Sequence, residues 1–454
     1  MDIHTSVYSK NQLPYNVLDD LQVGVSVEHN PYDLSMDQLF QMAARQNKKR
    51  AYLFVSPVLG KHIPVSPYRS LLTGALLAAR LTEVVYDEPF PHRDELIRAF
   101  QQEHEEQVIY KQVQESRFSL PERSLFIGFA ETATALGQSV FEHFTNARYV
   151  HTTREDLVGI APTLNFQEEH SHATDQRCYG EEEFTHDGPV VLVDDEITTG
   201  KTALNIIRTM QETYPRSTYV VLSILDWRSE EHQQRFRSVE EEQGITIHEV
   251  SLLKGTMESQ GEVLLSNEPA SESIDGETSV QEITAQPFKA FHSDRYVLST
   301  NGVGEVSERP YLSNTGRFGL SESDQLALEE AAASFGLYLR NVRKGSKTLC
   351  LGTGEFMYIP MKLASYMGEG VQYQSTTRSP IHLADKKGYA VQAKLTYKSP
   401  EDRSVQHFLY NMHPNQYDEV FVFLERSRSE EEMKSFLEAL TSTGVETIHL
   451  VTFS

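Results

Sequence analysis

The sequence has little cysteine and an excess of negative charge. Cys178 and Cys350 are its two cysteines in 454 residues. Two distant thiols exclude a disulfide framework and a thiolate zinc cage. Lys and Arg together number 41 against 65 Asp and Glu, which gives a net charge of −24 that repels polyanions. We therefore expect no nucleic acid among the partners of this protein.

The sequence also lacks a long apolar run. The longest one, residues 71–81, is too short to span a bilayer, and residues 1–5 lack the basic and apolar pattern of a secretion signal. We expect no membrane contact and a cytoplasmic location. A chain of this length that is 39% hydrophobic can bury more than one core, so two domains are expected.

A stretch without Lys or Arg separates two similar halves. Residues 257–286 hold seven carboxylates, a composition that buries too little apolar surface to fold. We predict an acidic flexible linker at 257–290, between a first domain at 1–256 and a second domain at 291–454. In both domains short apolar runs alternate with helical patterns, which predicts α/β domains, each with a parallel sheet flanked by helices. The runs begin at Ala51, Ser124, Ala147, Val190 and Thr218, and then at Thr348, Gly370, Val420 and Thr447.

Two segments of the first domain recur in the second at a constant offset of 224 positions. Residues 125–131 correspond to 349–355, and residues 149–154 correspond to 373–378. Seven identities lie in these segments, mainly at strand-end loops, where open α/β folds bind ligands. Chance similarity between two α/β units is the alternative.

The strongest indication of function is at residues 190–202. A buried strand leads into Asp194 and Asp195, then into a small-residue loop and a helix. Backbone N–H groups at such a helix N-terminus suit a phosphate dianion, and two carboxylates beside them suit a sugar diol or a hard cation. A Walker loop is excluded because its first glycine is missing. The predicted phosphate loop consists of Thr198, Thr199, Gly200, Lys201 and Thr202.

This segment resembles the signature of the type I phosphoribosyltransferases, in which an apolar strand precedes two acidic residues and a small-residue loop. The resemblance implies the type I fold and the substrate 5-phosphoribosyl-1-pyrophosphate. Asp194 and Asp195 would then hold the ribose hydroxyls and, partly through water, Mg²⁺. Glu196 departs from the signature, where an apolar residue is usual. Thr198 stands where purine-salvage members place an acidic base, so the chain is nearer to the orotate-type branch. An ordinary strand and capped helix is the structural alternative.

Three further segments fit the same frame. Gly60, Lys61 and His62 follow an apolar run and supply two cationic side chains for a pyrophosphate loop. Glu131 lies in a loop that begins a helix with small and hydroxyl residues, which suits a second anion. Arg154 ends the next strand, where its guanidinium can bind phosphate oxygens at two points or form a surface salt bridge.

Two other features carry open alternatives. The polar stretch 166–175 lies where the family places its mobile catalytic hood, and His170 and His172 would replace the Lys or Arg of related hoods. A solvated loop, or a zinc site with Cys178 that lacks a fourth ligand, are the alternatives. Trp227, the only tryptophan, follows a strand and either stacks on a substrate base or packs in the core.

Residues 377–380 read Thr-Arg-Ser-Pro and follow the loop 352–355. With the first-domain motifs, they resemble the phosphoribosyltransferases with a C-terminal TRSP domain of bacterial tellurium-resistance and stress gene clusters. That resemblance implies synthesis of a nucleotide-like metabolite and a second, Rossmann-like α/β domain. The strand beginning at Glu419 has no acidic pair or Thr-Thr-Gly loop after it, so a second ordinary active site is not expected. The second-domain candidates for binding a phosphorylated or acidic small molecule, or for completing the first site, are Gly352, Gly354, Glu355, Thr377, Arg378 and Ser379, with Arg317 beside them. A purely structural domain is the alternative.

The sequence therefore predicts a Mg²⁺-dependent transfer of the phosphoribosyl group to a nitrogen acceptor. This acceptor is a small-molecule base or amine that the sequence does not identify. Lys61 and Arg154 would hold the pyrophosphate that leaves C1, and the loop around His170 and His172 would exclude water. A non-catalytic sensor of phosphoribosyl pyrophosphate or a nucleotide is the main rival. Removal of a base from a nucleotide is a third hypothesis. The oligomeric state is left open, although a homodimer is possible because dimers are common in folds that share loops between subunits.

Overall fold

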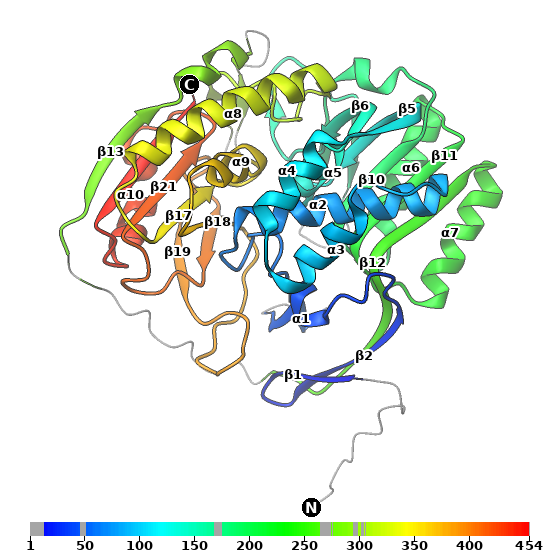
Figure 1. The fold of residues 1–454 in the computed structure, drawn as a ribbon, viewed down its shortest axis with the longest axis horizontal. Helices are drawn as coiled ribbons and strands as arrows, with labels where there is room; N and C mark the ends of the chain where they lie inside the picture. Colours follow the sequence, from blue (N-terminus) through cyan, green and yellow to red (C-terminus); the bar gives the residue numbers. More distant parts are fainter. Residues whose placement is uncertain are drawn as a thin grey trace, which may run out of the picture.

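The computed structural model describes residues 13–45, 51–167, 175–263, 274, 276–293, 298–300, 304 and 306–453. The chain forms two α/β lobes side by side, with helices α2, α5 and α9 near their junction (Figure 1). No helix in the described ranges is long and apolar enough to cross a membrane.

The larger sheet has the strand order β1-β2-β12-β11-β10-β5-β6-β16. Its central strands from β12 to β6 are parallel, while β1, β2 and β16 extend the two edges in antiparallel pairs. The strand β16 comes from the second half of the chain. The strands are β1 (Leu13–Leu18), β2 (Leu21–His29), β5 (Phe118–Gly128), β6 (Phe144–His151), β10 (Val190–Ile197), β11 (Thr218–Asp226), β12 (Thr246–Gln260) and β16 (Leu320–Ser321).

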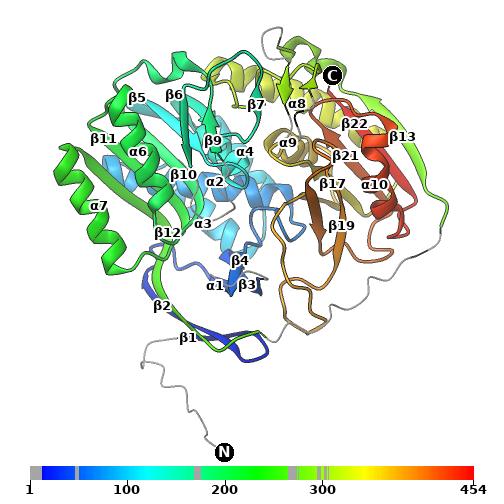
Figure 2. The same ribbon diagram turned by 180° about the vertical axis from the view of Figure 1, so that it is seen from behind.

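Helices cover both faces of this sheet. Figures 1 and 2 show α6 and α7 on one face and the helices from α2 to α5 on the other. This arrangement confirms the predicted α/β class and the helical patterns found in the sequence. The elements are α1 (Met36–Leu39), α2 (Pro67–Leu81), α3 (Arg93–Gln102), α4 (Glu106–Glu115), α5 (Ala133–Phe141), α6 (Lys201–Thr213) and α7 (Glu230–Gln243), with short helical turns at Thr82–Tyr86 and Glu181–Phe184.

The second lobe has a sheet of order β13-β22-β21-β17-β18, with every pair parallel. The predicted second α/β domain is confirmed. Its elements are β13 (Ser279–Thr284), β17 (Thr348–Gly352), β18 (Val371–Ser375), β21 (Glu419–Leu424), β22 (Thr447–Thr452), α8 (Glu322–Val342), α9 (Tyr358–Tyr366), α10 (Glu430–Thr441) and a helical turn at Gln286–Phe291. Short strand pairs and triplets outside the two sheets are β3 (Gln41–Ala44), β4 (Tyr52–Val55), β7 (Asp156–Leu157), β8 (Leu164–Gln167), β9 (Asp175–Cys178), β14 (Ser299–Thr300), β15 (Val306–Ser307), β19 (Lys394–Lys398) and β20 (Gln406–Tyr410).

Two expectations differ from the structure. The run beginning at Ala51 forms β4, which pairs antiparallel with β3 and does not join the parallel sheet. A short buried apolar run fits any sheet, so its pattern does not indicate which strand β4 pairs with. In the stretch 257–290, expected to be a linker, β12 continues to Gln260 and β13 pairs with β22. Backbone pairing with a sheet orders these polar residues without burying their side chains. The domain boundaries stay a prediction.

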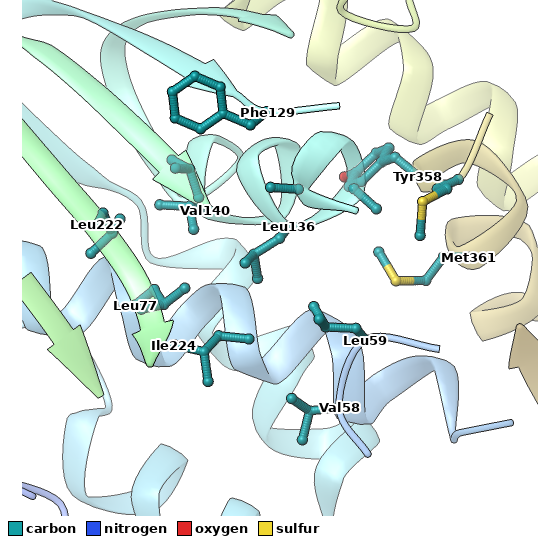
Figure 3. Packing of buried hydrophobic residues seen from close by; sticks show 14 of the residues in the cluster. Val58, Leu59, Leu77, Phe129, Leu136, Val140, Leu222, Ile224, Tyr358 and Met361 are labelled. Atoms are coloured by element: carbon teal, nitrogen blue, oxygen red, sulfur yellow. The ribbon is translucent and has the colours of Figure 1, made fainter. Parts of the chain in front are cut away.

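One hydrophobic core continues from the first lobe into the second. Leu59 and Leu136 from the first lobe belong to the same buried cluster as Tyr358 and Met361 of α9 (Figure 3). A buried ion pair crosses the same junction, with Lys362 Nζ 3.0 Å from Glu142 Oε2 and both side chains 1% exposed. The two lobes therefore depend on each other for burial.

The repeated segments share their backbone geometry. Thr152 Oγ1 accepts a hydrogen bond from the N–H of Ala130 at 2.7 Å, and Thr376 Oγ1 accepts one from Gly354 at 3.1 Å. Two more hydrogen bonds recur at the same offset of 224 positions. The N–H of Thr152 donates to the carbonyl of Gly128, as the N–H of Thr376 does to that of Gly352. The N–H of Glu155 donates to Thr153 Oγ1, as the N–H of Ser379 does to Thr377 Oγ1. The matched hydrogen bonds favour a repeated unit over chance similarity, so we interpret the two lobes as copies of one unit.

Candidate functional site

The predicted phosphate loop lies between a strand and a helix. The strand β10 ends at Ile197 and α6 begins at Lys201. Gly200 precedes the helix with φ +70°, and a Cβ there would lie 2.4 Å from the ring of Phe236. Glycine is therefore required at this turn. Thr199 Oγ1 accepts a hydrogen bond from the N–H of Lys201 at 3.3 Å. Thr198, Thr199, Lys201 and Thr202 are all half-buried. The first N–H groups of α6 point out of the helix beside this loop, as a phosphate site requires.

Asp194 and Asp195 occupy the end of β10, directly before this loop. Asp194 Oδ1 accepts a hydrogen bond from the N–H of Asp195 at 2.9 Å. Burial, with repulsion from Glu196, raises the pKa of Asp195 to about 6. The strand end thus concentrates negative charge that a cation would stabilise, which fits Mg²⁺. In the described residues no group of three His, Cys, Asp or Glu could hold a metal. A Mg²⁺ ion here would take its other ligands from phosphate and water, as is common for this ion.

Three charged side chains of low exposure form one group beside the acidic pair. Lys61 Nζ lies 3.1 Å from Glu131 Oε1, and Arg154 Nη1 lies 3.6 Å from Glu131 Oε2. Burial alone would raise the pKa of Glu131, but the charges of Lys61 and Arg154 outweigh it and lower the pKa to about 2. Burial lowers the pKa of Lys61, and Glu131 opposes that shift. The partner of Arg154 is buried, so this pair is not the surface salt bridge considered as an alternative.

The structure corrects one expectation about the pyrophosphate loop. Gly60 takes a left-handed conformation with φ +65°, and Lys61 and His62 follow it. Burial, and then the charge of Lys61, lowers the pKa of His62 to about 3. His62 is therefore neutral, and the loop carries one cation where the sequence predicted two.

Trp227 packs in the core. Its side chain is 4% exposed, and its ring stacks on Phe54 with centroids 5.2 Å apart and 13° between the planes. The ring of Phe40 meets it edge-on at 5.4 Å. These contacts favour the packing alternative over stacking on a substrate base.

The predicted hood lies partly outside the described residues. His170 and His172 belong to the segment 168–174, which is not described, while β8 and β9 on either side pair with each other. Cys178 in β9 is buried, and burial raises the pKa of its thiol to about 12. The zinc alternative also needs His170 and His172, so it lies partly outside the described residues and stays a hypothesis.

The second-domain candidates lie against the first-domain loops. Glu355 accepts hydrogen bonds from the Thr153 hydroxyl at 2.6 Å and from the N–H of Arg154 at 2.8 Å. Arg317 Nη2 lies 3.5 Å from the same carboxylate. The charge of Arg378 helps to lower the pKa of Glu131, so it too lies near the first-domain group. Gly352, Gly354, Thr377 and Ser379 form the loops that hold these side chains through the repeated hydrogen bonds.

The sequence analysis did not select some residues that the structure places here. His407 in β20 interacts electrostatically with Glu131, and burial lowers its pKa to about 4. Arg426 and Arg428 follow β21 and line a cavity with Arg154 and Arg378. Their place after a strand of the second copy was the available clue.

Comparisons with known proteins agree with this geometry. Residues 39–256 match the family described as phosphoribosyl transferase, and residues 314–440 match the family described as the TRSP domain C-terminal to it. Together the two matches take in about three quarters of the chain. No curated protein matches the sequence.

Similar solved structures include three adenine phosphoribosyltransferases. The one from Rhodothermus marinus is 16% identical, with a TM-score of 0.26, over 48% of this chain and 96% of its own. The one from Thermoanaerobacter pseudethanolicus is 13% identical, with a TM-score of 0.26, over 48% and 97%. The one from Trypanosoma brucei, in complex with AMP, pyrophosphate and ribose-5-phosphate, is 16% identical, with a TM-score of 0.21, over 28% and 55%.

Proposed function

The chain is a phosphoribosyltransferase of the family with a C-terminal TRSP domain, and we propose that it transfers the phosphoribosyl group of 5-phosphoribosyl-1-pyrophosphate to a nitrogen acceptor with Mg²⁺. One observation carries this proposal. An acidic pair at a strand end is followed by a small-residue loop that begins a helix, and Asp195 of this pair lies near the charged group of Lys61, Glu131 and Arg154. The 5′-phosphate, the ribose hydroxyls and the pyrophosphate of the substrate would then each have a matching group of residues.

The first-domain residues have separate tasks in this proposal. The loop from Thr198 to Thr202 would hold the 5′-phosphate, and Asp194 and Asp195 would hold the ribose hydroxyls and Mg²⁺. Lys61 would reach the pyrophosphate from beside Asp195, since the charges of these two groups affect each other's pKa. When bound, Mg²⁺ supplies positive charge to the departing pyrophosphate.

Bond breaking at C1 would precede capture by the acceptor. The C1–O bond to pyrophosphate breaks with its electron pair on oxygen, and positive charge develops on the ribose. The acceptor nitrogen then donates its lone pair to C1 and loses its proton. Positioning and charge stabilisation supply most of the rate enhancement for such a step, so a strong general base is not required.

The second domain would complete this site. Glu355 holds the backbone of Arg154, and Arg378 lies near Glu131. In the proposal both act as positioning groups for the pyrophosphate end. The hood residues His170 and His172 would exclude water. The cytoplasmic location and the tellurium or stress pathway are implied by the family resemblance alone. A homodimer stays a prediction, checked by light scattering.

Calorimetric titration of phosphoribosyl pyrophosphate with Mg²⁺ tests the site. We expect binding by the wild type and loss of binding in the double variant Asp194→Asn/Asp195→Asn. The matched control is Asp19→Asn/Asp20→Asn, an adjacent acidic pair exposed in the β1–β2 turn, which should bind like the wild type. Equal binding by all three proteins would overturn the site.

Release of pyrophosphate distinguishes an enzyme from a sensor. A wild type that binds the substrate but releases no pyrophosphate with any base or amine acceptor tested would favour the sensor. Pyrophosphate-dependent release of a base from a nucleotide would instead show the reverse reaction.

A further inference from the structure

The two copies of the unit are related by a two-fold relation, in which a loop of each copy contacts a strand of the other. Ser375 in β18 donates its N–H to the carbonyl of Gly60 at 2.6 Å, and His151 in β6 donates its N–H to the carbonyl of Gly316 at 3.0 Å. The two donors are 224 positions apart, and each loop contacts the strand of the other copy. Reciprocal contacts of this kind define a two-fold relation.

The residue after each glycine makes the same ion pair within its own copy. Lys61 pairs with Glu131 at 3.1 Å, and Arg317 pairs with Glu355 at 3.5 Å. Since Glu355 is the counterpart of Glu131, Arg317 is the counterpart of Lys61. The second copy thus keeps the cation and carboxylate of the first site.

The counterpart of the acidic pair can be identified from strand register. The strands β10 and β21 both lie next to the repeated strand of their copy, with Leu192 opposite Ile127 and Val422 opposite Leu351. Ile127 and Leu351 are 224 positions apart. Three residues after Leu192 stands Asp195, and three residues after Val422 stands Glu425. Arg426 and Arg428 follow, at the positions of Glu196 and Thr198.

A cavity of about 920 Å³ lies at this place in the second copy. Its lining includes the β19–β20 turn, which is the counterpart of the hood. An antiparallel backbone bridge joins Thr377 to Phe408 of β20, and an equivalent bridge joins Thr153 to Arg177 of β9. The cavity extends from Arg154 and Arg378 to Arg426 and Arg428.

Positive charge predominates in this lining. It contains seven arginines and five carboxylates, although the whole chain has a net charge of −24. Three of the carboxylates are paired with arginines of the same lining, since Glu155 lies 3.6 Å from Arg426, Glu401 lies 3.9 Å from Arg428 and Glu432 lies 3.1 Å from Arg309. The lining as a whole therefore holds more guanidinium groups than carboxylates, which favours an anion as the ligand.

Two of these arginines, Arg426 and Arg428, are held in place before any ligand arrives. The side chain of Arg426 is 4% exposed, donates to the Ser299 hydroxyl at 2.8 Å and lies 4.0 Å over the ring of Tyr311. The side chain of Arg428 is 3% exposed. Arg378 makes no hydrogen bond or ion pair with any residue that the structure describes. Buried guanidinium groups bind phosphate oxygens in pairs with little loss of entropy.

We propose that this cavity, lined by Arg154, Arg378, Arg426 and Arg428, binds a pyrophosphate-bearing small molecule without a metal ion. Arg426 stands where the first copy has Glu196, and Arg428 where it has Thr198, so lining arginines would supply here the positive charge that Mg²⁺ would supply in the first site. The proposal rests on the repeat and the cavity, and does not require the transfer reaction.

The test is calorimetric titration of inorganic pyrophosphate in the presence of EDTA. Without free metal we expect the wild type to bind, and Arg428→Gln to bind about tenfold more weakly, the usual effect of losing one charged hydrogen bond. The control Arg235→Gln, on the exposed face of α7, and the double variant Asp194→Asn/Asp195→Asn should both bind like the wild type.

Three results would overturn the proposal. They are no binding by the wild type in EDTA, equal binding by Arg428→Gln and the wild type, and loss of binding in the Asp194→Asn/Asp195→Asn variant, which would assign the binding to the first site. If Arg428→Gln melts at a lower temperature than the wild type, Arg403→Gln replaces it. Arg403 lines the same cavity with its side chain 50% exposed, so its loss disturbs no core.

Discussion

The carboxylate of Glu355 accepts a hydrogen bond from the backbone N–H of Arg154, 201 positions away in the sequence, at 2.8 Å. The Thr153 hydroxyl donates to the same carboxylate at 2.6 Å. A side chain of the second domain thereby fixes the strand-end loop that presents Arg154 to Glu131. The TRSP domain is part of the first site in this structural sense.

Replacing Glu355 by Gln should weaken substrate binding. The amide keeps the shape of the side chain but loses the charge that holds the loop and faces Arg317. We expect a loss of about 1–3 kcal/mol in the free energy of unfolding, together with weaker binding of phosphoribosyl pyrophosphate in calorimetry. Glu369→Gln, at an exposed position of the same domain, is the control. Unchanged binding and stability in Glu355→Gln would show that the contact is incidental.

Substrate binding should depend on pH through Asp195. Its folded-state pKa of about 6 lies above the ordinary value of 3.8 because of burial and Glu196. The folded protein without ligand thus binds an extra proton between these values, and this contribution to stability is lost as pH rises through about 6. Binding of Mg²⁺ and substrate requires the ionised carboxylate, so affinity should fall below about pH 6. Calorimetry from pH 5 to 8 measures this fall, and Asp195→Asn should bind weakly across the whole range.

Replacing Lys362 by Met should destabilise the whole molecule. Lys362 pairs with Glu142 at 3.0 Å and with Glu329 at 2.6 Å at the junction of the lobes. Loss of the cation leaves a buried carboxylate unpaired, which costs about 3–5 kcal/mol. Urea unfolding measures this loss, and Lys387→Met at an exposed position should leave stability unchanged. A loss as small as that of the control would contradict the assigned role of the pair.

The exchanged loops should each require glycine. Gly60 and Gly316 have φ of +65° and +89°, and a Cβ on either would lie 2.6 or 2.4 Å from a tyrosine ring of the other copy. Gly244 has the same φ as Gly60 but open space around it, so Gly244→Ala measures backbone strain alone, about 1–2 kcal/mol. We expect Gly60→Ala and Gly316→Ala to lose about 1–3 kcal/mol more, because overpacking adds to the strain. Equal losses in thermal or urea unfolding would argue against the tight two-fold contact.

The local features of the site were predictable from the sequence. A strand, an acidic pair and a small-residue loop determine their own geometry over a dozen residues, so β10, Gly200 and α6 lie as expected. The copying of the unit also left identities that could be counted. These features depend on neighbours in sequence, which pattern reasoning can use.

Features that depend on distant neighbours were not predictable. The charge of His62 depends on how deeply its loop is buried, and the setting of Trp227 depends on Phe40 and Phe54, which come from elsewhere in the chain. The partner of β4 depends on the whole topology. The arginine cavity forms because two copies meet face to face, and no single segment contains that information.

The reciprocal loop exchange has a consequence for biosynthesis. When the first half of the chain leaves the ribosome, β6 lacks its edge partner β16, and the apolar surface of α5 lacks α9. Open strand edges and uncovered apolar surfaces are the features that make nascent chains aggregate. The first half must therefore wait for translation of the second before it is protected, and chaperones that hold nascent chains should engage it during that interval.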